Sequence, residues 1–171
     1  MQEPRLSPVS YVVLGLLEWF GTSTPYELKG FVKESIGNFW TLQHAQLYTE
    51  PERLESFGYV TEEREDGGRR RKRYTITDAG RQALREWRET PTAVLSELRD
   101  QGLLKLFFGA DPAQLAATEL ERHRAKLAHY EAIKADDDGR GPRGPFLALQ
   151  AGLRHEREWI AYWEALADGE M

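Results

Sequence analysis

The sequence of 171 residues predicts a mainly α-helical protein built from two domains. Three observations indicate this fold class. Capping side chains followed by proline mark several helix starts, because the side chain accepts a backbone hydrogen bond and proline suits the first helical position. One glycine turn between two runs of alternating polarity predicts a β-hairpin. Residues after position 90 keep helical spacing. We therefore expect one domain over residues 1–90 and a helical one over residues 91–171.

The first two helices both begin at such a capping signal. Ser7-Pro8 precedes apolar residues that recur at helical spacing as far as Phe20. Thr24-Pro25 repeats the signal, and Glu27 stands where a capping-box carboxylate reaches back to the amide of the capping residue. The pair Gly37-Asn38 is expected to end the second helix.

The third helix is expected over residues 43–56 and has two different faces. Leu47 and Leu54 lie on one side. Pro51 deletes one backbone hydrogen bond within this segment, which predicts either a kink or a first turn that is not α-helical. The rest of the surface carries hydrogen-bonding side chains: Gln43, His44, Gln46, Tyr48, Thr49 and Arg53.

A hairpin and a fourth helix complete the first domain. Residues 59–64 and 69–77 form two runs of alternating polarity around the turn at residues 65–68, whose glycines supply the positive φ of a tight hairpin. Thr77 then caps a helix that extends through Trp87. The order helix, helix, helix, hairpin, helix predicts a winged helix-turn-helix domain.

The second half is expected to contain two or three helices. One begins at Thr90-Pro91 and is interrupted near Gly102. A longer helix begins at Asp111-Pro112. Residues 135–144 are too rich in glycine and charge for a regular element, and Pro145 begins the last helix.

The positive charge is concentrated at one place in the chain. The formal net charge is -5. Residues 1–90 hold 13 Lys and Arg against 14 Asp and Glu, whereas residues 91–171 hold 10 against 14. Five consecutive cations in the hairpin form one positive site on an otherwise acidic surface. They are Arg69, Arg70, Arg71, Lys72 and Arg73.

Several functional classes lack the residues that they need. The chain has no cysteine, and its four histidines form no His-x-x-x-His pair, so we expect no metal site and no cofactor. No phosphate-binding glycine loop or nucleophile elbow is present, and we expect no enzyme. The apolar run from Val9 to Leu17 lacks secretory signals and is too short to span a membrane. A cytoplasmic protein is expected.

The polar helix and the basic hairpin are complementary to duplex DNA. Such a helix can enter the major groove while a neighbouring basic hairpin contacts the flanking backbone or minor groove. On this hypothesis the cations at residues 69–73 neutralise phosphates. The residues expected to contact base edges are Gln43, His44, Gln46 and Thr49. Lys29 and Tyr48 are expected to anchor phosphates, and Arg53 completes the predicted DNA-contact set.

Other interpretations of the same residues stay open. A run of charges is often only a solvated face, and Tyr48 can instead pack the third helix on the first. A protein-interaction module that keeps this fold without binding DNA is the main alternative function. An enzyme that uses a pocket in the second domain is a third hypothesis.

Short segments of the first half have the order and spacing of a known family. They are Ser7 to Leu17, Thr24 to Lys29, Gln46 to Tyr48, Arg53-Leu54 with Gly58, Thr61 to Arg64, Gly67-Gly68, and Arg73 to Thr77 with Gly80. Residues 6–90 thereby resemble the PadR transcriptional regulators, and residues 98–109 resemble the helical C-terminal domain of one branch. The resemblance implies a winged-helix domain, a helical dimerisation domain, and a repressor relieved by a small ligand. Many relatives have proline directly after the Leu-Tyr pair, where this chain has Thr49.

Aromatic residues near the C-terminus predict an interface. Aromatic side chains at helical spacing bury large areas, which favours the core of a homodimer. The resemblance implies the alternative that some of them line an apolar pocket for a flat ligand. The candidate ligand or dimer-interface residues are Phe146, Leu149, Leu153, Trp159, Ile160, Tyr162 and Trp163.

These expectations combine into one hypothesis, a homodimeric and ligand-responsive repressor of transcription. Its two recognition helices would bind half-sites about 34 Å apart on a palindromic operator in double-stranded DNA. A small aromatic or hydrophobic ligand in the second domain would favour a dimer geometry that no longer matches this spacing.

Overall fold

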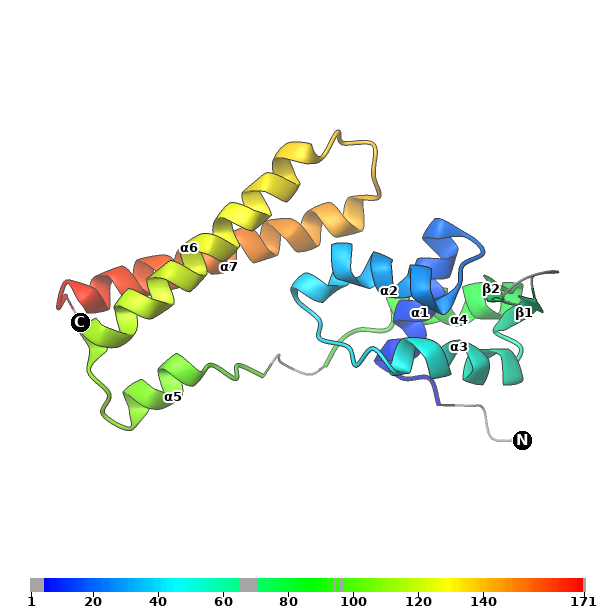
Figure 1. Cartoon of the computed structure of the whole chain (residues 1–171), viewed down its shortest axis with the longest axis horizontal. Helices are drawn as coiled ribbons and strands as arrows, with labels where there is room; N and C mark the ends of the chain where they lie inside the picture. Colours follow the sequence, from blue (N-terminus) through cyan, green and yellow to red (C-terminus); the bar gives the residue numbers. More distant parts are fainter. Residues whose placement is uncertain (1–4, 65–70, 94, 96, 171) are drawn as a thin grey trace. The chain divides into compact units, whose positions relative to one another are not determined.

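The computed structural model describes residues 5–64, 71–93, 95 and 97–170. The chain divides into two compact units, Met1–Val94 and Leu95–Met171 (Figure 1). The predicted boundary, between residues 90 and 91, lies slightly earlier in the chain. Each unit has a hydrophobic core of its own.

The first helix, α1 (Pro8–Phe20), begins where its capping signal predicts. Ser7 and Ser10 cap it reciprocally: the Ser7 hydroxyl accepts from the Ser10 amide at 3.4 Å, and the Ser10 hydroxyl accepts from the Ser7 amide at 2.8 Å. Two of the amides that a helix N-terminus leaves without partners are thereby satisfied.

The second helix, α2 (Pro25–Glu34), confirms the predicted capping box. The Thr24 hydroxyl accepts from the Glu27 amide at 3.2 Å, and the Glu27 carboxylate accepts from the Thr24 amide at 2.7 Å. The helix ends earlier than predicted, because a separate 3₁₀ turn, η1 (Ile36–Asn38), follows it.

The third helix, α3 (Gln46–Ser56), contains Pro51 and is preceded by tighter turns. The amides of Gln46, Leu47 and Tyr48 donate to carbonyls three residues earlier, at 3.0, 3.2 and 3.1 Å. This 3₁₀ pattern is one of the two outcomes that the proline predicts. The expected start at residue 43 is therefore wrong, and residues 43–45 lead into the helix instead of lying on it.

The predicted hairpin is present, followed by the predicted fourth helix. Strand β1 (Val60–Arg64) pairs antiparallel with β2 (Lys72–Ile76), so that the first residue of β1 faces the last residue of β2. Helix α4 (Asp78–Glu89) is capped by the Thr77 hydroxyl, which accepts from the Gly80 amide at 3.2 Å. The predicted glycine turn, residues 65–68, lies outside the described residues.

A third segment joins the hairpin, which the sequence analysis did not predict. Ser23, in the short connection between α1 and α2, exchanges two backbone hydrogen bonds with Tyr74 of β2, at 3.0 and 2.9 Å. The hairpin is thus fixed to the loop that precedes α2. One residue is too short for the period-2 pattern that reveals a strand in a sequence.

The core of the first unit lies where these elements meet. It includes two buried leucines of α3, on the side predicted to be apolar, and the buried ring of Tyr74. Its buried members are Val13, Leu14, Leu16, Leu17, Leu28, Val32, Leu47, Leu54, Val60, Tyr74, Ile76 and Leu84. Burying the α3 leucines leaves the opposite face of that helix in solvent.

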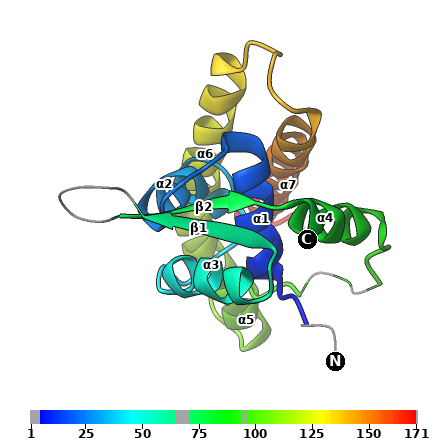
Figure 2. The same ribbon diagram turned by 90° about the vertical axis from the view of Figure 1, so that its right-hand side faces the viewer.

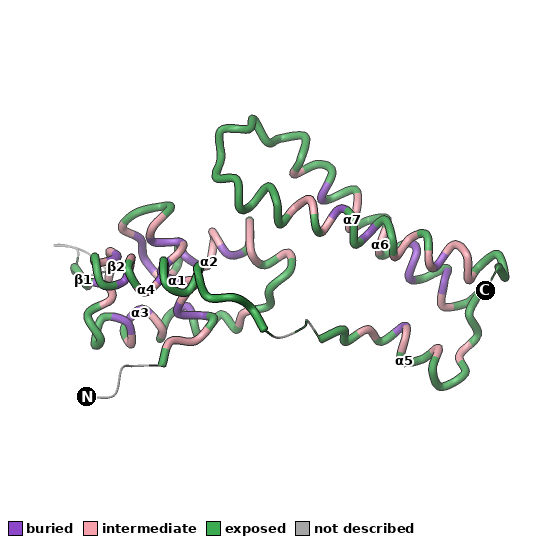
Figure 3. The backbone as a smooth tube through the Cα atoms, turned by 180° about the vertical axis from the view of Figure 1, so that it is seen from behind, coloured by how far each residue is buried: buried purple, intermediate pink, exposed green. Residues whose placement is uncertain are grey.

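The second unit consists of one short and two long helices. They are α5 (Gln101–Phe107), α6 (Pro112–Asp136) and α7 (Arg143–Ala167). The predicted start of α6 is confirmed, because the Asp111 carboxylate accepts from the Gln114 amide at 2.8 Å. Helices α6 and α7 run antiparallel and bury their facing sides (Figure 3).

The helix predicted to begin at Thr90-Pro91 is wrong. The described residues from 91 to 100 contain no helix. The Thr90 hydroxyl donates to the Glu86 carbonyl at 2.8 Å and so closes α4, whereas Asp100 caps α5 through the Leu103 amide at 2.9 Å. Gly102 lies inside α5 and does not interrupt it. A Cβ at this position would meet the buried indole of Trp163 at 3.0 Å, so the glycine allows the close contact between α5 and α7.

Candidate nucleic-acid interface and aromatic groove

An exposed polar surface surrounds the start of α3. Gln43, His44, Gln46, Tyr48 and Thr49 all have exposed side chains. The Gln46 side-chain oxygen accepts from the Gln43 amide at 3.3 Å and thereby steadies the turn before the helix. These residues are free to meet bases or phosphates, and Tyr48, at 45% exposed, is only partly covered by packing.

The hairpin lies directly against α3, and one lysine joins the two. Figure 2 shows β1 beside α3. The Lys72 ammonium on β2 lies 2.6 Å from the Glu52 carboxylate of α3 and 3.1 Å from the Glu62 carboxylate of β1. The structure therefore brings the base of the predicted wing and the predicted recognition helix together.

The two carboxylates and a buried phenol set the electrostatics at this junction. Burial acts to raise the pKa of Glu62, but hydrogen bonds from Arg64, Lys72 and Tyr74 outweigh it and leave the pKa lowered. Burial and the hydrogen bond to Glu62 raise the pKa of Tyr74 to about 12. The carboxylates also raise the pKa of Lys72 above its ordinary value. The lowered pKa of Glu62 and the raised pKa of Lys72 keep both of these groups charged at neutral pH.

The remaining hairpin cations differ in their surroundings. Arg71 is exposed just before β2. Arg73 points back into the unit, where its guanidinium donates to the Thr22 carbonyl at 2.9 Å. Arg69 and Arg70 lie outside the described residues. Lys29 lies on α2 with a half-buried side chain. Among the described residues, no hydrogen bond or ion pair joins it to α3, β1 or β2.

Arg53 differs from the other predicted DNA contacts, because its guanidinium is engaged within the unit. It donates to both oxygens of Glu50, at 3.0 and 2.7 Å, and to the buried Ser10 hydroxyl at 2.9 Å. Ser10 in turn donates to Glu50 at 2.5 Å. This cluster fastens α3 to α1. The sequence analysis did not single out Ser10, because contacts between residues 40 or more positions apart leave no local pattern.

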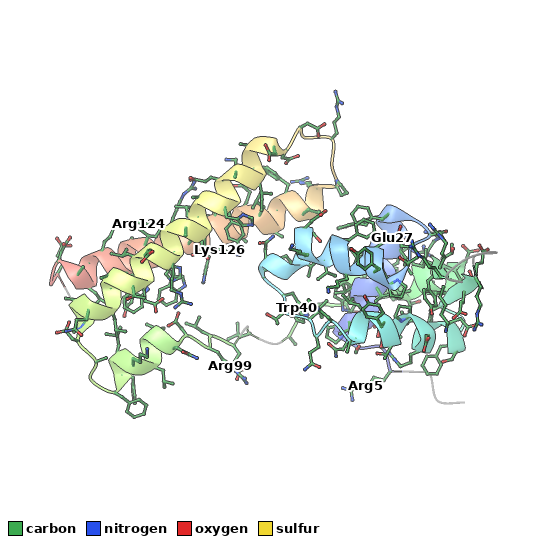
Figure 4. All side chains as sticks on the ribbon, in the orientation of Figure 1. Arg5, Glu27, Trp40, Arg99, Arg124 and Lys126 are labelled. Atoms are coloured by element: carbon green, nitrogen blue, oxygen red, sulfur yellow. The ribbon has the colours of Figure 1, made fainter. Side chains whose placement is uncertain are left out.

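An exposed aromatic pair, which was not predicted from the sequence, precedes this surface in the chain. Phe39 and Trp40 lie between η1 and α3 in the chain and are 65% and 43% exposed. Figure 4 labels Trp40. Contiguous exposed apolar side chains often mark an interaction surface.

The C-terminal aromatics form one cluster on α7. Trp163 is fully buried, and the ring of Trp159 lies 6.4 Å from that of Trp163 and 5.5 Å from that of Tyr162. The indole N–H of Trp163 has no acceptor among the described residues. Of the other predicted interface residues, Leu153 is buried, Ile160 and Leu149 are half-buried, and Phe146 is 41% exposed.

Buried charges accompany these rings, which is unusual for a two-helix core. His123 of α6 contacts Glu156 of α7 at 2.5 Å and stacks on Trp159 with ring centroids 5.8 Å apart. Glu119 accepts two hydrogen bonds from Arg122, both at 3.0 Å. Across the residues that the structure describes, no group of three or more potential ligands has the geometry to hold a metal ion.

An open groove of about 500 Å³ lies next to the aromatic cluster. Its lining residues come from α5, the segment before it, and α7. They are Leu98, Leu103, His155, Glu158, Trp159 and Tyr162.

No helix among the described residues is both long and apolar enough to cross a membrane.

Both units match known families. Residues 13–86 match the transcriptional regulator PadR-like family, and residues 98–168 match the family described as virulence activator alpha C-term. The chain is 27% identical over 173 residues to the negative transcriptional regulator PadR of Bacillus subtilis, an alignment that covers 92% of this chain and 94% of the relative.

The fold agrees with crystal structures of the same relative. Bacillus subtilis PadR in complex with operator DNA gives a TM-score of 0.84 at 26% identity, covering 95% of this chain and 98% of that one. The complex of that protein with p-coumaric acid gives 0.78 at 27% identity, covering 94% and 96%. Because both units match in sequence and the fold agrees along nearly the whole chain, the protein belongs to the PadR-like family of DNA-binding transcriptional regulators.

Proposed function

We propose that this protein is a cytoplasmic, homodimeric repressor that binds a palindromic operator through its first unit and responds to a small aromatic ligand through its second. The observation that carries the proposal is the junction at Lys72, where the hairpin is held against α3 by carboxylates from both. A duplex that receives the start of α3 in its major groove would meet the hairpin beside it.

Within this function the DNA contacts divide into two groups. Gln43, His44, Gln46 and Thr49 would contact base edges, because amide, imidazole and hydroxyl groups all form hydrogen bonds there. Arg69, Arg70 and Arg71 would neutralise phosphates, with Tyr48 and Lys29 as further anchors. We assign Arg53, Lys72 and Arg73 to positioning, because their described contacts are with the protein.

The relative that binds operator DNA and p-coumaric acid supports the regulatory half of the proposal. The second unit has the features that a dimerisation and ligand-binding domain needs, an aromatic cluster and an adjoining groove. We assign dimerisation and ligand binding to residues 91–171 and DNA binding to residues 1–90. No catalytic role is proposed for either.

Fluorescence anisotropy with the protein's own upstream DNA tests the proposal. Arg71→Ala should weaken binding to all sequences and lower the slope of log affinity against log salt by about one. Gln46→Ala should instead reduce the preference for the operator over random DNA. Arg154→Ala, an exposed arginine of α7, is the matched control and should change neither.

The same experiment distinguishes the main alternative. A protein-interaction module that does not bind DNA would contact duplexes weakly and with little dependence on salt. Weak binding that neither Arg71→Ala nor Gln46→Ala alters would overturn the regulator proposal.

A further inference from the structure

The groove of the second unit is lined almost entirely by apolar atoms, and its one charged lining residue is a glutamate. Of its six lining residues, two are leucines and two are aromatic, and the one carboxylate is Glu158. Neither lysine nor arginine is among the lining residues. Among the described residues no hydrogen bond or ion pair engages Glu158, so its charge is available to a molecule in the groove.

The histidine in the groove does not offset this charge. The Trp159 indole N–H donates to Nε2 of His155 at 2.8 Å, and a nitrogen that accepts a hydrogen bond carries no proton. In this geometry the ring proton of His155 lies on Nδ1, which offers a hydrogen bond to a molecule in the groove. A carboxylate ligand would meet Glu158 and no lysine or arginine among the lining residues.

The aromatic wall is held rigidly by its neighbours. Trp159 contacts Tyr162 edge to face at 5.5 Å, and the His123 ring stacks on it at 5.8 Å. An indole fixed in this way presents a constant surface to a flat ring or to a cation, because the faces of aromatic rings attract positive charge.

We propose that this groove binds a small aromatic molecule that carries an ammonium group, and that it disfavours aromatic carboxylates. The ring packs against Trp159 and Tyr162, and the ammonium pairs with Glu158. The inference rests on the proposed function, since it specifies the chemical class of the ligand for the second unit. It also separates this chain from its relative, whose solved complex contains p-coumaric acid.

Isothermal titration calorimetry on the full chain at pH 7 tests the inference with three matched probes. They share one ring and differ in charge: 2-naphthylmethylamine, 2-naphthoic acid and 2-naphthylmethanol. We expect the amine to bind at least about tenfold more tightly than the acid, the range of one charge-assisted pair. Glu158→Gln should remove most of this difference by weakening amine binding and leaving alcohol binding unchanged.

Two controls make the result specific to the groove. Glu121→Gln is the same substitution at an exposed position of α6 and should leave all three affinities unchanged. Trp159→Phe keeps an aromatic ring and should weaken all three probes by a similar factor. Equal or tighter binding of the acid, or unchanged amine binding in Glu158→Gln, would overturn the inference.

Operator binding measured in the same buffers separates the inference from the proposed function. Operator release by the acid and not by the amine would overturn the inference and leave the regulator proposal intact. Loss of all probe binding together with a shift in the dimer dissociation constant of Trp159→Phe would assign the groove to the contact between two copies, which also overturns it. Absent operator binding would overturn the regulator proposal, whichever probe binds.

Discussion

At the scale of single residues, carboxylates decide which cations of the first unit are available. Arg53 and Lys72 both belong to the predicted DNA-contact set, yet Arg53 is held by Glu50 and Lys72 by two glutamates, at 2.6 to 3.1 Å. From the sequence, both cations are expected to contact DNA. The partners of Lys72 lie on other elements, and spacing along one element carries no information about them. Glu50 lies three residues before Arg53 on the same helix, a spacing that the sequence does show, whereas the Ser10 contact of Arg53 comes from another helix.

Removal of the Arg53 side chain should destabilise the first unit. Arg53→Ala leaves the Glu50 carboxylate, with a side chain only 12% exposed, dependent on Ser10 alone. We expect a loss of about 1–3 kcal/mol in the free energy of unfolding, the usual cost of a buried polar group that loses a partner. Urea denaturation measures it. Arg85→Ala, an exposed arginine of α4, should cost less than about 0.5 kcal/mol, and equal losses would contradict the role of the cluster.

Glu27 makes the stability of the first unit depend on pH. Hydrogen bonds from the Thr24 amide and hydroxyl lower the pKa of Glu27, which projects from the start of α2 (Figure 4). A lowered folded pKa means that its contribution is complete above the ordinary glutamate value of about 4.3 and is lost as the pH falls through the folded value. Glu27→Gln should therefore be less stable than the parent chain at pH 7.

Thermal unfolding at a series of pH values checks this expectation. The difference in melting temperature between the parent chain and Glu27→Gln should shrink as the pH falls below about 4. Glu34→Gln, at the opposite end of the same helix, should show no such convergence. A difference that stays constant across the pH series would contradict the electrostatic explanation.

At the scale of elements, caps and breaks were predictable and close approaches were not. Capping serines, threonines and aspartates located most helix starts, because they act on the amides next to them in the chain. The same signal failed at Thr90, which closes the preceding helix instead of opening a new one. A threonine can serve either end of a helix, and only packing decides between them.

Gly80 tests a close approach between α4 and its neighbours. A Cβ at this position would lie 2.2 Å from the Tyr59 carbonyl oxygen and 2.9 Å from the Ile76 side chain. Because backbone cannot yield as a flexible side chain does, Gly80→Ala should destabilise the unit by about 1–3 kcal/mol or more. Gly30→Ala, inside α2 with open space around it, should be neutral or stabilise by up to about 1 kcal/mol.

Circular dichroism during urea unfolding gives both values. A similar small effect of the two substitutions would mean that α4 does not pack as closely on the hairpin as the structure places it.

At the scale of the whole molecule, the chain has two cores that share no residue. The sequence predicted this division from its change in pattern after the hairpin. It did not predict which aromatic rings are buried, because Trp159, Tyr162 and Trp163 all repeat at helical spacing on one short stretch of α7. Trp163 is the fully buried member, and its ring lies against Gly102 of α5, a contact that helical spacing on α7 does not reveal.

A cavity made in one core should therefore loosen that unit first. Leu153→Ala empties a fully buried position of α7 and should cost about 2–5 kcal/mol. Hydrogen exchange followed by mass spectrometry should show faster exchange in α6 and α7, with little change in α1 to α4. Leu54→Ala should give the reverse pattern, and uniform acceleration across both units in either variant would contradict independent cores.

The backbone pairing of Ser23 with Tyr74 has a consequence for how a signal would travel within the first unit. The connection before α2 and the inner strand of the hairpin share two hydrogen bonds, so neither can be displaced alone. A displacement of β2 would therefore be passed on to the connection that precedes α2. The amino end of α2 and strand β2 would then move together, because Ser23 joins them through its backbone.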